Sequence, residues 1–145
     1  SLSLLLFTLC ITVSCINDNI PGANMVAATT ADTPFAGTDI PPSWRYVYSD
    51  GTTSSWSSDL DNAGIDDFQE GGLSVFVQEN QPVRDASKTL TGVQLRLKFT
   101  AADDDWNVTS FYIFTSPISP FCWGGLVSVS PTTHPIIPNN GLCSG

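Results

Sequence analysis

Two stretches decide the fold: GLSVFVQ at residues 72–78 and GVQLRLKFT at residues 92–100. Each alternates apolar and polar side chains, which places the apolar ones on one face of an extended chain. We therefore expect two antiparallel, half-buried strands. The segment between them contains Pro82 and Asp85 and is longer than a tight hairpin turn, so it is predicted to be a solvated connection.

Further short strands are predicted from alternation and turn residues elsewhere in the chain. They cover residues 44–48 and 107–115, with weaker strands at 52–57, after an Asp50-Gly51 turn, and at 126–130. Residues 17–42 are rich in Pro and Gly and are predicted to form a loop or extended arm, and residues 116–145 a Pro-rich tail. The predicted fold class is all-β: a single antiparallel, jelly-roll-like β-sandwich domain over residues 1–145.

The composition fits one folded domain with few charges. The chain has 145 residues, of which 41% are hydrophobic and 13% charged, and 5 Lys and Arg against 14 Asp and Glu give a net charge of −9. The hydrophobic share is enough to fill a core. Phosphate backbones are bound by clustered cations, so no direct nucleic-acid binding is expected.

The N-terminal segment allows two interpretations. Residues 2–16 are apolar and end on Val13-Ser14-Cys15, as a lipoprotein signal with a lipidated Cys15 would. Residues 6–15 also alternate apolar and polar side chains, which favours a strand. We expect the strand. The signal would place the protein outside the cell or on its surface.

The four cysteines and the single histidine suggest no reactive centre. Cys122 and Cys143 flank the tail and could form a disulfide, and free thiols are an equal alternative. Their spacing does not fit a structural zinc site. His134 has no nucleophile near it in the sequence. We find no catalytic constellation and expect the protein not to be an enzyme.

Two further groups of residues are candidate binding sites. Asp59, Asp61, Asp67 and Glu70 are spaced like the ligands of a calcium loop, although Ala63 occupies one ligand position. A solvated acidic loop is the alternative, and no other cofactor is expected. Trp44, Tyr46 and Trp56 could form a stacking platform for carbohydrate or protein, but their alternation favours core packing.

The run over residues 72–104 resembles the last two strands of picorna-like virus capsid jelly rolls. The resemblance implies an eight-stranded jelly roll that assembles with copies of itself or related subunits into a virion. Our first hypothesis is therefore a structural, self-assembling capsid subunit. The alternative is a secreted or lipid-anchored surface β-sandwich module that binds carbohydrate or a host protein.

Overall fold

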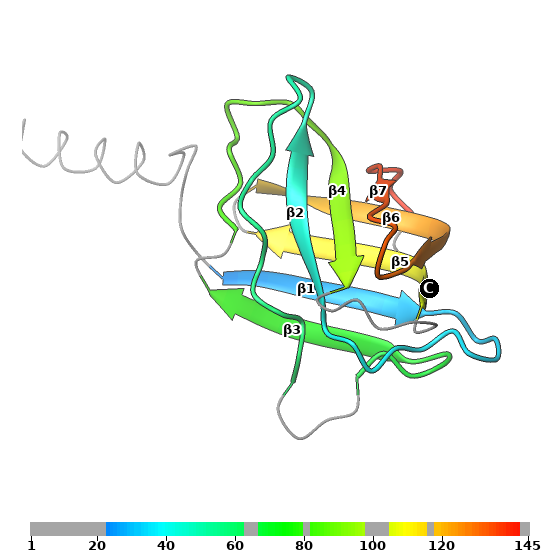
Figure 1. Ribbon diagram of the computed structural model, residues 1–145. Helices are drawn as coiled ribbons and strands as arrows, with labels where there is room; N and C mark the ends of the chain where they lie inside the picture. Colours follow the sequence, from blue (N-terminus) through cyan, green and yellow to red (C-terminus); the bar gives the residue numbers. More distant parts are fainter. Residues whose placement is uncertain (1–22, 63–66, 80–81, 98–104, 116–117, 143–145) are drawn as a thin grey trace, which may run out of the picture.

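The structure, a computed structural model, describes residues 23–62, 67–79, 82–97, 105–115 and 118–142. The described residues form seven strands in two antiparallel sheets (Figure 1). The four-stranded sheet has the order β3-β1-β5-β6, made of Leu73–Glu79, Ala23–Thr30, Trp106–Thr115 and Ile118–Val129. The three-stranded sheet has the order β2-β4-β7, made of Pro42–Tyr48, Leu90–Leu97 and Ile136–Ile137. The all-β, antiparallel sandwich prediction is confirmed.

The two sheets are stacked as layers, with the strands of one running across those of the other (Figure 1). One core lies between them and contains side chains from both sheets. The rings of Trp44 on β2 and Phe111 on β5 meet edge to face, with 6.4 Å between centroids. The indole nitrogen of Trp44 also donates to Gln78 Oε1 on β3 at 2.9 Å, which satisfies the polar end of a fully buried tryptophan.

The two strands that decided the fold are present, but they lie in different sheets. β3 pairs with β1, whereas β4 pairs with β2 and β7. The long connection between β3 and β4 is the physical reason, because it lets the chain cross from one layer to the other. Three more strands follow β4, and the strands predicted at residues 107–115 and 126–130 lie in β5 and at the end of β6.

The prediction of a loop or arm over residues 17–42 is wrong where β1 lies. β1 occupies the interior of its sheet, paired with β3 on one side and β5 on the other. Its inward side chains, Asn24, Val26, Ala28 and Thr30, are buried, yet most are small or polar. Pro and Gly residues lie outside both ends of this strand. Backbone pairing on both sides therefore stabilises β1, although its side chains give little indication of a strand.

The tail predicted over residues 116–145 is also corrected, because it contains β6 and β7. Its last described residues return to β6 of the same chain. The backbone nitrogens of Asn140 and Gly141 both donate to Cys122 O, at 3.0 and 3.1 Å. The Asn140 side chain accepts from Gly124 N and donates to Gly124 O. These bonds fasten the tail within the chain.

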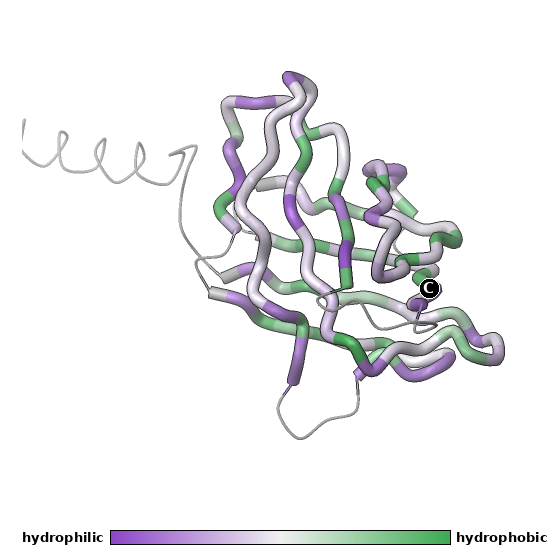
Figure 2. The backbone as a smooth tube through the Cα atoms, viewed as in Figure 1, coloured by the Kyte–Doolittle hydropathy of each residue, from purple (hydrophilic) through white to green (hydrophobic). Residues whose placement is uncertain are grey.

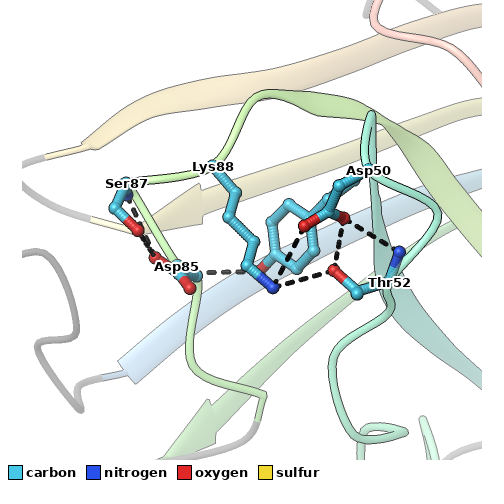
Figure 3. Close-up of polar contacts among 6 residues, drawn as sticks. Asp50, Thr52, Asp85, Ser87 and Lys88 are labelled. Carbon is cyan, nitrogen blue, oxygen red and sulfur yellow. Dashed lines mark hydrogen bonds and ion pairs between the residues drawn. The ribbon is translucent and has the colours of Figure 1, made fainter.

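The turn at Asp50-Gly51 is confirmed and is braced by polar contacts (Figure 3). The Thr52 hydroxyl and amide donate to Asp50, and with Lys88 they hold the pKa of Asp50 below its usual value. Lys88 Nζ lies 3.4 Å from Asp50 Oδ2 and donates to the Thr52 hydroxyl. In the neighbouring turn, Asp85 accepts from Ser87, which lowers the pKa of Asp85. The brace joins the ends of β2 and β4.

Within the part of the chain that the structure describes, no helix is long and apolar enough to cross a membrane. The strand predicted over residues 6–15 and the lipidation site at Cys15 lie outside the described residues.

Candidate binding surfaces

The acidic residues predicted to bind calcium are not gathered as one ligand set. Both carboxylate oxygens of Asp67 accept from Asn62, at 2.8 Å from the backbone nitrogen and 3.3 Å from the side chain. Glu70 Oε1 accepts from the backbone nitrogen of Phe35 at 2.8 Å. Among the described residues, no three acidic, histidine or cysteine side chains stand close enough together to hold a metal ion. Two of the four carboxylates therefore brace loops.

Part of the acidic group does share a cavity at this end of the sandwich. A cavity of about 210 Å³ is lined by Asp39, Asp61 and Asp67, together with the core residues Leu60 and Phe68. Asp39 was not predicted as a ligand, because it lies in the β1–β2 connection, about twenty residues before the acidic segment. Asp59 does not line the cavity.

Phe35 is a surface feature that the sequence did not reveal. It lies in the connection between β1 and β2, its side chain is 91% exposed, and its φ of 64° is unusual for a bulky residue. The bond from its nitrogen to Glu70 holds this conformation. The one indication of this exposed residue in the sequence was an apolar ring among turn-forming residues. The neighbouring cavity, about 460 Å³, is lined by Phe35, Asp39 and Glu70.

The predicted aromatic platform is not formed. Trp44 and Tyr46 are buried in the core, with 0% and 2% exposure, so core packing is the correct interpretation for both. Their rings pack edge to face with centroids 5.0 Å apart. Trp56 is half-buried, and guanidinium groups from Arg45 and Arg96 lie over its ring. No stacking surface of three aromatic rings is therefore available to a sugar.

An exposed apolar area lies on the outside of the four-stranded sheet. We define the outer apolar face as the outward side chains of β1, β3 and β5: Met25, Ala27, Leu73, Val75, Val77, Tyr112 and Phe114. In the strand register, Met25 lies between Val77 and Phe114, and Ala27 between Val75 and Tyr112. Residues opposite each other across strands are in contact distance, so these side chains form continuous rows.

These rows are accessible and uncharged. Val77 and Leu73 are 69% and 67% exposed, and Val75, Met25 and Phe114 are each about 40% exposed. Figure 2 shows hydrophobic and hydrophilic residues interspersed along the strands of both sheets. The outward side chains Leu73, Val75 and Val77 of β3 are apolar, whereas its buried inward side chains are Ser74, Phe76 and Gln78. A half-buried strand with one solvated face would carry polar side chains at the outward positions.

Cys122 is disulfide-bonded, which corrects the alternative of a free thiol. Cys143, its partner predicted from sequence, lies outside the described residues. His134 is exposed, and its carbonyl oxygen accepts from Gln94 Nε2 at 3.1 Å.

No family model matches this sequence, and no curated protein matches it. Solved structures do resemble its fold. Coral 8R-lipoxygenase, described as activated by calcium through a C2-like domain, matches 80% of this chain with a TM-score of 0.61 and 19% identity. The alpha toxin of Clostridium absonum matches 92% of this chain with a TM-score of 0.63, also at 19% identity. The Clostridium perfringens alpha-toxin matches 86%, with a TM-score of 0.55.

These matches assign the fold, a C2-like β-sandwich, and they correct the functional hypothesis. The chain spans 16% of the coral lipoxygenase and 36% of the Clostridium absonum toxin. The expectation of a capsid subunit in a virion is wrong, because the sandwich resembles a domain of these longer proteins. The strand alternation at residues 72–104 that suggested a capsid is common to all-β proteins in general.

Proposed function

We propose that this chain is a non-catalytic binding module of an extracellular or cell-surface protein, and that it docks onto a neighbouring protein domain through the outer apolar face. The row Val77–Met25–Phe114 is the observation that carries the proposal. Apolar side chains left exposed in one contiguous area mark interaction sites, because water contact with them is unfavourable. The partner is another domain of the same polypeptide, as expected for a fold that makes up 16% of the coral lipoxygenase.

The chemistry of the face favours a protein partner over carbohydrate. Its seven side chains carry no charge in a chain with a net charge of −9, and one hydroxyl, that of Tyr112, is their sole polar group. Sugar recognition needs hydrogen-bonding groups beside an aromatic ring, whereas the core of a protein interface is apolar and aromatic. The burial of Trp44 and Tyr46 removes the platform on which carbohydrate binding rested.

The disulfide at Cys122 supports a location outside the reducing cytosol. Disulfides persist in secreted and surface proteins and are rare in reducing compartments. Cys122 lies on β6, close in sequence to Gly124, which the Asn140 side chain contacts. The disulfide therefore belongs to the same region as the hydrogen bonds that hold the tail to β6. A secreted or surface-anchored module agrees with this chemistry.

Thiol labelling of the natural full-length protein tests the docking. Val77→Cys places a reactive thiol on the outer apolar face, and mass spectrometry reads labelling at that position. We expect Cys at position 77 to be protected in the natural protein and labelled in this chain alone. Thr91→Cys is the matched control, because Thr91 is exposed on the other sheet and should be labelled in both. Equal labelling at position 77 in both proteins would contradict docking.

We also propose that calcium binds at the cavity lined by Asp39, Asp61 and Asp67, as a second function of the module. The observation that favours it is that Asp39 from the β1–β2 connection lines one cavity with Asp61 and Asp67 from the β2–β3 connection. Calcium takes clustered carboxylate and carbonyl oxygens. Asp39 and Asp61 would supply carboxylate oxygens to the ion, beside Asp67, which also accepts from Asn62. The calcium activation described for the coral lipoxygenase is that protein's own property, and it supports the proposal through the shared fold.

A further inference from the structure

Two arginines converge on one tryptophan at the outside of the three-stranded sheet. The Cζ atoms of Arg45 and Arg96 lie 4.3 and 4.0 Å from the centroid of the Trp56 ring. Arg45 on β2 and Arg96 on β4 point outward, because their chain neighbours on both strands are buried in the core. Trp56 comes from the segment after the Asp50-Gly51 turn, so three separate parts of the chain build this cluster.

Both guanidinium groups are held by a side-chain hydrogen bond from their Nε atom. Arg45 Nε donates to Gln94 Oε1 at 2.9 Å, and Arg96 Nε donates to Ser43 Oγ at 3.0 Å. Gln94 is itself held through its amide nitrogen, which donates to the His134 carbonyl. The terminal Nη nitrogens of both arginines have no acceptor among the described residues, and they are not enclosed. Each arginine is thus held in place with its forked donors facing outward.

The cluster carries uncompensated positive charge. Among the described residues the single ion pair is Lys88 with Asp50, so no carboxylate neutralises Arg45 or Arg96. Burial, and then the charge of Arg96, lower the pKa of Arg45, as expected for two cations in proximity. One arginine would suffice to cover a tryptophan. The second adds repulsion that an anion between or beside the two groups would relieve.

We propose that Arg45 and Arg96 form a binding site for an oxyanion, a carboxylate, sulfate or phosphate group, with Trp56 as the support on which both are stacked. The fork of a guanidinium matches two oxygens of such a group, and bonds to a charged acceptor are the strong ones. The site lies on the opposite sheet from the outer apolar face and is independent of the protein docking proposed above.

Tryptophan fluorescence tests this site directly, because Trp56 touches both guanidinium groups and is the least buried of the tryptophans in the described strands and loops. Sodium acetate, sulfate and phosphate are titrated separately at constant ionic strength, balanced with chloride. We expect a saturable fluorescence change with at least one of the three. A preference for acetate would identify a carboxylate ligand, and a preference for sulfate or phosphate a tetrahedral one.

Variants separate binding from a structural role of the cluster. Arg96→Gln should raise the dissociation constant roughly tenfold or more, since it removes charge-assisted hydrogen bonds to the anion. Lys88→Gln is the matched control, because it removes a cation that already has a partner, and it should leave the titration unchanged. Should Arg96→Gln fail to fold, Arg96→Lys retains the charge and loses the fork, and should still weaken binding. A linear response equal to that of chloride, or equal constants in all variants, would overturn the proposal.

Discussion

Serine hydroxyls complete the backbone hydrogen bonding of β2 at its outer edge. The backbone nitrogens of Trp44 and Tyr46 donate to Ser57 Oγ and Ser54 Oγ, at 3.0 and 2.9 Å. In return, Ser57 N and Ser54 N donate to the carbonyl oxygens of the same two residues. The segment predicted as an edge strand therefore lies along β2, but side chains replace half of its backbone bonds. An edge covered in this way is closed to pairing with other chains.

The buried phenol of Tyr46 makes stability sensitive to alkaline pH. Burial raises its pKa to about 12 from the ordinary 10.0, despite the opposing bond to Thr115 and the charge of Arg84. Because the folded pKa is raised, this contribution to stability is complete below pH 10 and is lost as the pH rises towards 12. The difference amounts to roughly 2 to 3 kcal/mol.

Urea unfolding measured across this pH range checks the effect. We expect the free energy of unfolding of the wild type to fall between pH 10 and 12. Tyr46→Phe should lack most of that fall, because it has no phenol to ionise. The control is Tyr112→Phe, which changes a half-buried tyrosine on the outer apolar face and should leave the fall in place. A pH dependence shared by the wild type and Tyr46→Phe would assign it to other groups.

At the scale of elements, the contact between β4 and β7 depends on a glycine. A Cβ placed on Gly92 would lie 2.6 Å from the carbonyl oxygen of Ile137 and 2.8 Å from a methyl carbon of Ile136. Because a carbonyl on a paired strand cannot move alone, Gly92→Ala should push β7 away from β4. We expect a loss of about 1 to 3 kcal/mol in unfolding free energy.

Thermal and urea denaturation measure this loss, with Thr89→Ala as the control. Thr89 is exposed and lies just before β4, so its change should stay within about 0.5 kcal/mol. If Gly92→Ala were as stable as the control, β7 would not be held against β4 in solution. Exchange of the Gln94 and Ile136 amides would locate the effect at this strand pair.

The strands differ in how far their sequences predict them. β2, β3, β4 and β5 alternate apolar and polar side chains over much of their length, and each was predicted within a few residues. β1 escaped prediction because alanine and threonine give little contrast between its two faces. β6 was predicted only at its end, within the weaker strand at residues 126–130, because its earlier part contains Pro120, Gly124 and Gly125, which ordinarily mark a loop. β1 and the first part of β6 are held by backbone pairing with distant strands, which a local sequence pattern does not show.

At the scale of the whole molecule, pairing between distant segments decides the candidate sites. The spacing from Asp59 to Glu70 predicted one calcium loop, but Asp67 and Glu70 support neighbouring loops. Asp39 enters the acidic cavity from a different connection. The outer apolar face likewise depends on the order β3-β1-β5, which brings side chains from three strands into one area. The residue types can be read from the sequence, but which of them become neighbours depends on the topology.

Calcium should stabilise the whole fold if it binds at the cavity of Asp39, Asp61 and Asp67. A ligand that binds the folded state alone adds about 2.7 kcal/mol at a hundredfold excess over its dissociation constant, which raises the melting temperature by several degrees. We expect calcium to produce this rise in the wild type, and a chelator to reverse it. Asp61→Asn should lose most of the rise, because Asp61 is an exposed carboxylate of the cavity.

Asp85→Asn is the matched control for this titration. Asp85 lies in the turn beside Lys88, away from the cavity residues, so its change should leave the calcium response intact even if it alters melting itself. Magnesium at the same concentration separates binding from screening, since it needs stricter octahedral geometry and gives up its water reluctantly. A melting temperature that calcium does not change, or changes equally in Asp61→Asn, would mean that these three carboxylates remain a solvated acidic surface.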